Sequence, residues 1–473
     1  MKIAHVTAEV VPWSKTGGLG DVAGALPKAQ AREGAQVGVF APFHREARHA
    51  AERHGLQLRP TGVGVRVHMG GADFTGTFLE HSWPDGSTTY LFDAPRFFDR
   101  HGLYVDENGR DYEDNGFRYA VFCQAVLQAA RRLMGGVPDV FHAHDWQAAL
   151  IPMYLRHAPV PTVLTIHNLA YQGVFHKGLL PAIGLDWSIF NAAQAEHYDR
   201  FGMLKGGIAT ADAVTTVSPN YAVEITTERF GHGLHHFIRN HARRLRGIIN
   251  GVDEDDWSPR VDPHIASRYS SSHLDGKADC RASLQQEFGL QVNPGEPVLA
   301  SISRFTHQKG IDLLADIAPR LEQLGAHLII LGTGDAALED RLRWLDSRHQ
   351  RLAVQVDFNV PLAHRITAGA DMILMPSRFE PCGLNQMYGM AYGTIPVVHA
   401  TGGLRDTVEH DVTGFLFEID DAAGLWWALE RAIERYRSQH WHYMMMEAMS
   451  RDFSWRGPAD EYLNLYRELK STF

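Results

Sequence analysis

The stretch Lys15-Thr16-Gly17-Gly18-Leu19-Gly20-Asp21-Val22 decides how this sequence folds. It follows an apolar run from Ile3 to Val11, which predicts a strand, and precedes an Ala-rich segment, Val22 to Arg32, which predicts a helix. A glycine turn between a strand and a helix forms an anion site, because backbone N–H groups and the helix N-terminus can face a phosphate. Lys15 adds a full positive charge. A βα turn without a ligand fits the stretch alone equally well, but a second copy, Thr401-Gly402-Gly403-Leu404-Arg405-Asp406, favours the anion site.

The composition is that of a globular protein of two or three domains, with 473 residues and 45% hydrophobic content. A net charge of −10 argues against nucleic acid or an anionic membrane as the main partner. The three cysteines, Cys123, Cys280 and Cys382, lie far apart and predict no disulfide framework. Polar residues interrupt the first apolar run too early for a signal peptide, and no apolar segment is long enough to span a bilayer. We therefore expect a cytoplasmic protein.

The first half of the chain alternates β-rich and helical segments, as in a parallel sheet with right-handed crossovers. One exception is the turn around Trp83-Pro84-Asp85-Gly86, which predicts a hairpin and therefore an antiparallel sheet edge. Arg118–Met134 is a predicted helix. The predicted strands are Lys2–Val11, Gln36–Ala41, Val63–His68, Asp73–Glu80, Thr88–Asp93, Val137–Ala143, Thr162–His167 and Ala213–Val217.

Turn residues between 245 and 262 predict a domain boundary, after which the same alternation restarts. Two α/β halves, each with a Gly-Gly loop, predict two doubly wound Rossmann-like domains that face each other across a cleft. We expect an N-terminal domain at 1–245, a C-terminal domain at 246–456 and a terminal amphipathic helix within 457–473 that packs back on a domain. The predicted strands of the second half are Pro297–Ile302, Ala326–Leu331, Leu352–Gln355, Met372–Met375, Ile395–Val398 and Phe415–Phe417.

Two neighbouring strands of the first half end in polar, His-bearing tips. His142-Ala143-His144-Asp145-Trp146 follows one strand, and Thr165-Ile166-His167-Asn168 ends the next. Ligands of parallel sheets bind at these carboxyl ends, and Trp146 there could stack on a sugar. A buried Trp with structural Asp and His neighbours is the alternative, and it is the better interpretation of the first tip alone.

Two motifs of the second half carry charge at strand ends. In Ser303-Arg304-Phe305-Thr306-His307-Gln308-Lys309-Gly310, Arg304 and Lys309 flank a short turn and could grip a diphosphate. Ser377-Arg378-Phe379-Glu380-Pro381-Cys382-Gly383-Leu384-Asn385-Gln386 places Glu380 before a helix start, where it could contact a sugar. The alternatives are a pair of solvated cations and a carboxylate that only complements the helix dipole.

Two further features have less specific interpretations. The polar, aromatic segment Phe97–Asn115 is longer than a crossover needs, so it is either a functional loop or a decorated surface loop. The 27 histidines are scattered rather than set at ligand spacing; His142-x-His144 and the cluster at 231–236 come closest. We expect surface or hydrogen-bonded histidines rather than a metal site.

The motifs KTGGLGDV, HAHDW, SRFTHQKG, RFEPCGLNQMYGMAYG and TGGLRDTV, in this order, resemble those of the bacterial glycogen synthases and plant starch synthases. The tail around Phe453-Ser454-Trp455 and Glu461-Tyr462 is also similar, so the resemblance spans nearly the whole chain. It implies a retaining glycosyltransferase of the two-domain GT-B fold. Many broader relatives carry a second Glu where this chain has Tyr388, and the glycogen and starch synthases lack it too.

The resemblance implies that ADP-glucose donates glucose to the non-reducing end of an α-1,4-glucan such as glycogen, without a cofactor or a metal ion. It implies catalytic roles for Glu380, His167, Arg304 and Lys309, and a returning C-terminal helix on the N-terminal domain. The donor-binding residues would be Lys15, Gly17, Gly18, Asp21, Asn250, Arg304, Lys309, Cys382, Gly383, Leu384, Thr401, Gly402 and Gly403. The acceptor candidates are Glu9, Tyr104, Asp145, Trp146 and Asn168.

Three other functions compete with this one. A related transferase could use UDP-glucose or another acceptor. A non-catalytic glucan-binding protein could share the fold, although Lys15, Arg304, Lys309 and Glu380 are all present. A glucan phosphorylase is disfavoured because no separate lysine motif for pyridoxal phosphate is evident.

Overall fold

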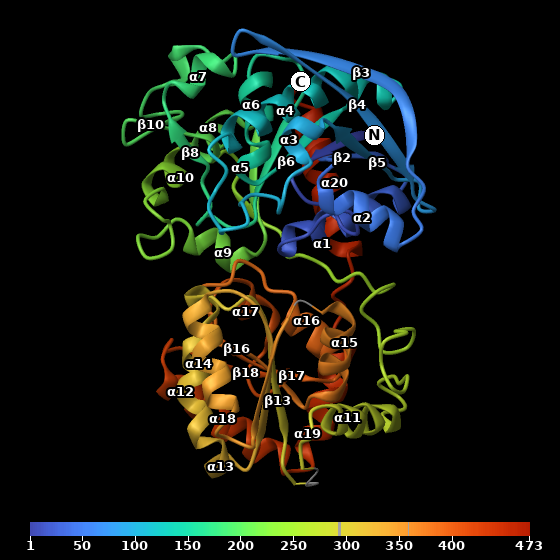
Figure 1. Ribbon diagram of the computed structural model, residues 1–473, viewed down its shortest axis with the longest axis vertical. Helices are drawn as coiled ribbons and strands as arrows, with labels where there is room; N and C mark the ends of the chain where they lie inside the picture. Colours follow the sequence, from blue (N-terminus) through green and yellow to red (C-terminus); the bar gives the residue numbers. More distant parts are fainter. Residues whose placement is uncertain (292–294, 358) are drawn as a thin grey trace. The chain divides into compact units, whose positions relative to one another are not determined.

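The computed structural model describes residues 1–291, 295–357 and 359–473, which form two compact units. The first unit comprises Met1–Gly251 together with Trp455–Phe473, and the second comprises Val252–Ser454 (Figure 1). The first unit continues past the boundary expected after residue 245, because β12 (Arg246–Gly247) pairs with a strand of the first sheet. None of the described helices is long and apolar enough to cross a membrane.

The first unit is built on a nine-stranded sheet, counted over the described residues, in the order β12-β11-β7-β6-β1-β2-β5-β4-β3. Its strands are parallel except that β4 runs antiparallel to both β3 and β5, so the predicted hairpin and antiparallel edge are confirmed. The remaining strands of this sheet are β1 (Lys2–Val6), β2 (Gln36–Pro42), β3 (Arg59–Met69), β4 (Ala72–Ser82), β5 (Thr88–Asp93), β6 (Val140–His144), β7 (Thr162–Ile166) and β11 (Ala213–Thr216).

The first strand is shorter than predicted, since β1 ends at Val6 rather than Val11. The chain turns there because the Thr7 hydroxyl donates to the backbone oxygen of Glu9, over 2.8 Å, and a local bridge joins Val10 to Ser14. The apolar residues after Val6 are buried in a loop, and burial alone does not distinguish such a loop from a strand. This loop brings Glu9 to the glycine motif.

Helix α1 begins inside the glycine motif, at Gly18, and ends at Arg32. Its buried face contains Leu19, Val22 and Leu26, at the spacing of an amphipathic helix. The other elements of the first unit are α2 (Arg45–Arg53), α3 (Pro95–Phe98), α4 (Asn115–Leu133), α5 (Asp145–Ala148), α6 (Leu150–Leu155), α7 (Leu179–Ala182), η1 (Trp187–Ile189), α8 (Met203–Thr210), α9 (Pro219–Glu224), α10 (His235–His241), and a small antiparallel sheet of β8 (Val174–His176), β10 (Arg200–Gly202) and β9 (Glu196–His197).

The second unit contains a six-stranded sheet, counted over the described residues, in the order β15-β14-β13-β16-β17-β18. Every described pairing in it is parallel, as the sequence predicts. Its strands are β13 (Val298–Ile302), β14 (His327–Gly332), β15 (Leu352–Val356), β16 (Met372–Met375), β17 (Ile395–His399) and β18 (Phe415–Phe417). Its helices are α11 (Asp275–Glu287), η2 (His307–Lys309), α12 (Ile311–Ile317), η3 (Ala318–Arg320), α13 (Leu321–Leu324), α14 (Ala336–Asp346), α15 (Val360–Gly369), α16 (Asn385–Ala391), α17 (Gly402–Thr407), α18 (Ala422–Tyr436) and α19 (His440–Ser450).

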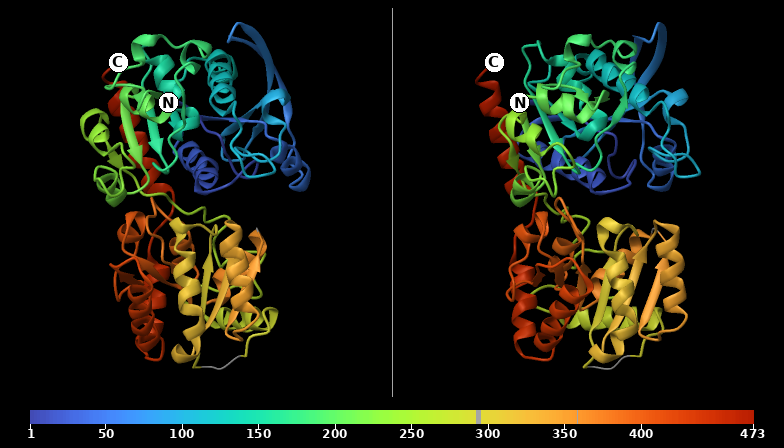
Figure 2. Two further views of the ribbon diagram at one scale, coloured as in Figure 1. Left: turned by 60° about the vertical axis from the view of Figure 1, so that its left-hand side comes forward. Right: turned by 90° about the vertical axis from the view of Figure 1, so that its left-hand side faces the viewer.

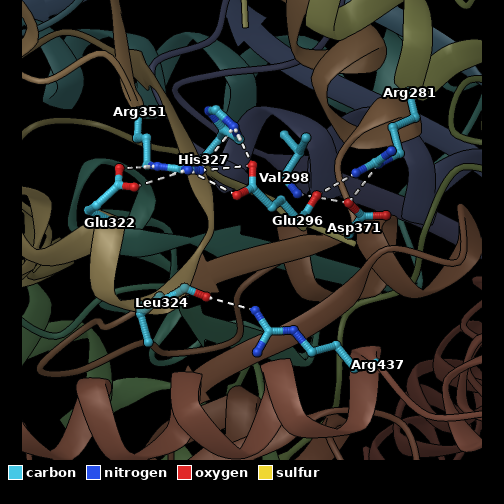
Figure 3. Close-up of polar contacts among 9 residues, drawn as sticks. All are labelled: Arg281, Glu296, Val298, Glu322, Leu324, His327, Arg351, Asp371 and Arg437. Atoms are coloured by element: carbon cyan, nitrogen blue, oxygen red, sulfur yellow. Dashed lines mark hydrogen bonds and ion pairs between the residues drawn. The ribbon is translucent and has the colours of Figure 1, made fainter. Parts of the chain in front are cut away.

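Ion pairs close the amino-terminal edge of the second sheet (Figure 3). Arg351 binds both carboxylate oxygens of Glu296, over 2.9 and 3.0 Å. The Asp371 carboxylate accepts hydrogen bonds from Arg281 Nε and from the backbone N–H of Val298, over 2.9 and 2.8 Å. These contacts lie at the strand starts, opposite the carboxyl ends that carry the predicted chemistry, so they fix the fold rather than the site.

Helix α20 (Arg456–Lys470) lies in the first unit, although it follows the second unit in sequence. Figures 1 and 2 show it in red among the blue and green elements of that unit. Its Tyr462, Leu465 and Tyr466 are buried in one core with Leu26 and Val140. Burying these apolar side chains stabilises the unit by about 1.5–3 kcal/mol for each large one.

Candidate active site

Glu9 holds the first glycine loop from within the first unit. Its buried carboxylate accepts hydrogen bonds from Thr16, through both the backbone N–H and the hydroxyl at 2.6 Å, and from the Gly17 N–H at 3.3 Å. Burial raises the pKa of Glu9, and these donors oppose that rise. The loop therefore binds an anion, as its shape suggests, but this anion is the protein's own carboxylate, so the N–H groups of Thr16 and Gly17 are not open to a phosphate.

Lys15 and Asp21 form an ion pair beside that loop, with Nζ and Oδ1 2.7 Å apart. Asp21 stands in the first turn of α1, where the helix dipole favours an acidic residue, and Gly18 is the first residue of the helix. Both side chains of the pair keep part of their surface exposed. Lys15 therefore remains accessible to a ligand at the loop.

Tyr104 links the long loop at 97–115 to Glu9, because its hydroxyl donates to the Glu9 carboxylate over 2.6 Å. The loop is held in turn by Arg118, a fully buried residue of α4. Arg118 donates to the backbone oxygens of Phe97 and Leu103 and to the side chain of Asn115. Arg118 could not be recognised from the sequence, because an arginine within a helical segment carries no sign of its burial.

Asp145 positions the backbone of His167 at the carboxyl ends of β6 and β7. Its carboxylate accepts the His167 N–H over 2.7 Å, and Asp145 adopts the left-handed conformation, with φ of 55°. Burial raises the pKa of Asp145 to about 7, against the hydrogen bonds from the backbone of His167 and Asn168. The two predicted strand tips therefore meet, as expected from their places in the sheet.

Trp146 is buried, with 8% of its surface exposed. Its ring packs edge-on against Tyr119, with centroids 5.4 Å apart, and lies against Phe175. Gly173 lies so close that a Cβ there would come within 2.6 Å of the ring. The expectation of an open platform for a sugar is wrong for Trp146, and the structural alternative describes it.

Four histidines form a buried cluster behind this tip: His5, His142, His144 and His167. One nitrogen of each of His5, His142 and His144 lies within 4.8 Å of the others, the spacing of a possible metal site. The ring nitrogens of these three residues are, however, engaged in hydrogen bonds to protein groups. The ring nitrogens that could bind a metal ion are thus already hydrogen-bonded, and a metal ion would have to break these bonds.

In the second unit, Lys309 and Glu380 form an ion pair at the carboxyl ends of β13 and β16. Lys309 Nζ lies 2.6 Å from Glu380 Oε2, and the same oxygen accepts the Ser377 hydroxyl over 2.9 Å. Glu380 is nearly fully buried. Arg304 is exposed, and no ion pair joins its side chain to any residue that the structure describes. An anion could therefore meet one cation held by a carboxylate and another that faces solvent.

The loops carrying Lys309 and Glu380 are tied together. Arg378 binds both oxygens of Asp312, over 2.8 and 2.6 Å, and donates to the backbone oxygen of His307. Gln308 donates to the backbone oxygen of Phe379. Because these contacts flank the ion pair on both loops, they fix the separation of its two groups.

The second glycine loop packs on the backbone of Glu380. A Cβ on Gly402 would lie 1.8 Å from the Glu380 oxygen, and the Gly403 N–H donates to that oxygen over 3.1 Å. The glycines at these positions therefore allow close approach to Glu380, and the Gly403 N–H is not open to a phosphate. Thr401, next to them, is buried at the N-terminus of the short helix α17.

The remaining predicted donor residues fall into two places. Asn250 is buried in the first unit, and its Oδ1 has no hydrogen-bond partner among the described residues. Cys382, Gly383 and Leu384 follow Glu380, and Gly383 has a positive φ of 73° that suits glycine. The structure thus gathers the predicted residues into a set in each unit: Lys309, Glu380 and their neighbours in the second, and Glu9, Lys15, Tyr104, Asp145 and His167 in the first.

Family models match both halves of the chain. The starch synthase catalytic domain matches residues 2–240, and the glycosyl transferases group 1 family matches residues 284–444. The catalytic domain of starch synthase IV from Arabidopsis thaliana, a structure bound to ADP and acarbose, superimposes with a TM-score of 0.90, at 30% identity and covering 99% of each chain. The two Rossmann-like units, with charged residues at their strand ends, define a glycosyltransferase of the GT-B class.

Similar proteins that align over the whole chain identify the family within this class. The glycogen synthase of Anaeromyxobacter sp. (strain Fw109-5) is 44% identical over 485 residues, covering 99% of each chain. Glycogen synthase 2 of Geobacter sulfurreducens is 42% identical over 488 residues, covering 100% of this chain and 99% of that one. The chain belongs to the glycogen and starch synthase family of glucosyltransferases.

Proposed function

We propose that this protein transfers glucose from ADP-glucose to the non-reducing end of an α-1,4-glucan, with retention of configuration. The observation that carries the proposal is the Lys309–Glu380 pair at the carboxyl edge of the second sheet, together with the exposed Arg304, which follows β13 in the same loop as Lys309. The similar starch synthase IV structure holds ADP and acarbose, and this supports an adenine nucleotide and a glucan as ligands.

Breaking the bond between glucose and the diphosphate places negative charge on the leaving group and positive character on the sugar. Arg304 and Lys309 stabilise the first, and such preorganised charges contribute about 3–4 kcal/mol each to lowering a barrier. Glu380 stabilises the sugar, while its ion pair with Lys309 and its bond from Ser377 keep it in place. In the first unit, His167 and Asn168 orient the sugar.

Retention ordinarily uses two close carboxylates and a covalent intermediate. Glu380 is engaged by Lys309 and Ser377, which weakens it as a nucleophile. We therefore favour a front-face displacement. The sugar–phosphate bond breaks with its electron pair going to the diphosphate, the acceptor oxygen forms the new bond, and the acceptor proton passes to a diphosphate oxygen.

The other predicted residues have supporting roles in this proposal. Lys15 contributes to donor affinity, with Asp21 holding its ammonium group and Gly17 and Gly18 shaping the loop. On the donor side, the segment at 382–384 and the loop at 401–403 set the backbone around Glu380, and the Asn250 Oδ1 has no hydrogen-bond partner in the part of the chain that the structure describes. Glu9, Tyr104 and Asp145 hold the loops of the acceptor side.

A cytoplasmic location is part of the same proposal. The named relatives are bacterial glycogen synthases, and Cys123, Cys280 and Cys382 form no disulfide among the residues that the structure describes. A reducing compartment keeps such thiols free.

The test is transfer of radiolabelled glucose from ADP-glucose to glycogen, with the linkage and the anomeric configuration of the product determined. The same assay with UDP-glucose at the same concentration is the comparison. We expect ADP-glucose to be used with much the higher kcat/KM and the new linkage to be α-1,4. Preference for UDP-glucose would favour the related transferase, and glucan binding without turnover would favour the non-catalytic alternative.

A further inference from the structure

A continuous hydrogen-bonded chain runs from Gln30 to His167 through two other imidazoles. Gln30 Oε1 lies 2.7 Å from His5 Nε2, and His5 Nδ1 lies 3.0 Å from His144 Nε2. His144 Nδ1 lies 2.9 Å from His167 Nε2. Gln30, His5, His144 and His167 are all buried, so water does not interrupt the chain.

The imidazoles in this chain are neutral at neutral pH. Burial lowers the pKa of His5 to about 4 and that of His167 to about 3, and it lowers the pKa of His144 well below its usual value. A neutral imidazole has one N–H donor and one acceptor nitrogen. Each ring that donates on one side must therefore accept on the other.

The amide of Gln30 fixes the direction of the whole chain. Its oxygen can only accept, so His5 carries its proton on Nε2 and accepts on Nδ1. His144 must then donate from Nε2 and accept on Nδ1, which makes His167 the donor from Nε2. The His167 Nδ1 atom keeps a lone pair, and it has no hydrogen-bond partner among the described residues.

Helix α20 contacts the nitrogen of this amide. Gln30 Nε2 donates to the Tyr466 hydroxyl over 3.3 Å, and that hydroxyl donates to His142 Nδ1 over 2.6 Å. His142 Nε2 then donates to Thr165 over 2.6 Å. A flipped amide would reverse the direction of every hydrogen bond on the His5 side and on the Tyr466 side. The network therefore has two self-consistent states, and the orientation of the Gln30 amide distinguishes them.

We infer that Gln30 is a positioning residue that sets the tautomer of His167, so that His167 Nδ1 accepts a hydrogen bond from a substrate hydroxyl. The inference rests on the proposed function for the identity of the substrate, a sugar. The assignment of the His167 tautomer does not rest on the proposed function. In the reversed network His167 would present an N–H donor instead, and that hydroxyl would have to turn and accept the hydrogen bond through its oxygen.

The direct test is nitrogen-15 NMR of protein labelled at histidine, without substrate. Long-range couplings distinguish the two neutral tautomers, and a His167→Asn variant assigns the resonance. We expect the Nε2–H form at His167 in the wild-type protein. Detection of the Nδ1–H form there overturns the inference, whatever the enzyme's activity.

Variants at Gln30 then connect the tautomer to turnover. Gln30→Met removes the amide and should populate the second tautomer at His167 and lower kcat about tenfold, as the loss of one hydrogen bond does. Gln30→Glu keeps an acceptor oxygen towards His5 and should restore both the tautomer and most of kcat. Gln36→Met is the matched control, because Gln36 makes a side-chain bond to the Met134 backbone elsewhere in the same unit.

The outcomes separate the inference from the proposed function. A fall in kcat for Gln30→Met with the Nε2–H form of His167 unchanged, or no rescue by Gln30→Glu, would assign Gln30 a merely structural role and overturn the inference. If Gln30→Met fails to fold, the tautomer measured at His167 in the wild-type protein still tests the inference. Absence of glucosyl transfer by the wild-type enzyme would refute the proposed function and leave the tautomer assignment standing.

Discussion

Lys309 Nζ and Glu380 Oε2 lie 2.6 Å apart, although 71 residues separate them in the sequence. Each comes from a loop at the carboxyl end of a neighbouring strand, and contacts between the two loops fix that separation. The pair keeps a buried carboxylate compensated before any ligand binds. An incoming diphosphate offers Lys309 a second anionic partner and so changes the charge that Glu380 experiences.

Lys309→Ala should lower kcat by roughly 10²–10³-fold, because a preorganised charge facing the leaving diphosphate is lost. The affinity for glucan should change much less. Steady-state kinetics with ADP-glucose, together with glucan binding measured separately, check this. Near-normal turnover would refute the role in diphosphate stabilisation.

The matched control is Arg341→Ala. Arg341 forms an exposed ion pair with Asp316 in the same unit, over 2.6 Å, away from the loops of the site. An exposed pair contributes about 0–1 kcal/mol, so both stability and kcat should stay near wild type. A second comparison is Arg351→Ala, at the opposite edge of the sheet, which should lower stability at full specific activity of the folded fraction (Figure 3).

Lys15→Ala should weaken the apparent affinity for the donor, since it removes the cation at the first glycine loop. Because Asp21 holds that cation over 2.7 Å, Asp21→Asn should weaken donor binding in the same direction but by less. The KM for ADP-glucose and direct ADP binding give the readout. Unchanged affinity in Lys15→Ala would exclude this role.

Tyr104→Phe should destabilise the first unit by about 2 kcal/mol, the size expected for a hydrogen bond to a charged group. The lost bond is the one of 2.6 Å from the Tyr104 hydroxyl to Glu9. Urea unfolding followed by a probe in that unit measures the change. Tyr112→Phe is a control, because its hydroxyl bonds a backbone oxygen at the exposed end of the same loop; equal losses in both variants would contradict the special role of Glu9.

The first unit should lose stability as the pH falls from about 6.5 toward about 4. Burial lowers the pKa of His5 to about 4 and the pKa values of His44 and His167 to about 3. The unfolded chain, with a histidine pKa of about 6.5, binds protons in this window that the native state does not, so protonation favours unfolding. Above pH 6.5 these histidines do not lower the free energy of unfolding. At pH 5 each of them lowers it by about 2 kcal/mol.

Urea midpoints of the first unit measured across this window check the sign. His44→Gln should flatten the pH dependence, because it removes one of these buried histidines. Stability that rises on acidification would contradict the neutral histidine cluster.

Chelators should leave glucosyl transfer unchanged. The three histidines with metal-ligand spacing have their nitrogens bonded to Gln30, Tyr466, Thr165 and one another, and the proposed chemistry uses cationic side chains for the diphosphate. Activity assays after treatment with EDTA test this. A loss of activity that added metal restores would show that the reaction needs a metal ion.

Local patterns made most of the fold predictable from the sequence. The parallel strands of the second unit, the antiparallel edge at Thr88–Asp93 and the glycine turn before α1 follow from hydrophobic runs and turn residues, which act over a few positions. The sequence predicts a first strand that is too long, because the residues after Val6 are apolar and buried but lie in a loop. A buried loop and a buried strand have the same composition.

The candidate site was predictable where a charged or polar side chain stands at a strand end, as for Lys309, Glu380 and His167. It was not predictable where a polar residue acts through distant partners. Gln30 lies on a helix face and Tyr466 is separated from His142 by 324 residues, so nothing in their own neighbourhoods reveals the network. The sequence predicts that the glycine loops present N–H groups to a phosphate, but Glu9 and the Glu380 backbone already accept hydrogen bonds from several of these groups.

The return of α20 to the first unit also has a consequence for biosynthesis. A ribosome adding about 5–20 residues per second needs on the order of ten seconds or more to pass from Gly251 to Trp455. Throughout that interval the nascent first unit lacks Tyr462, Leu465 and Tyr466, and the apolar face that they cover is open to chaperones and to aggregation. The histidine network stays incomplete until Tyr466 emerges, so maturation of the candidate site awaits translation of the helix that follows the second unit.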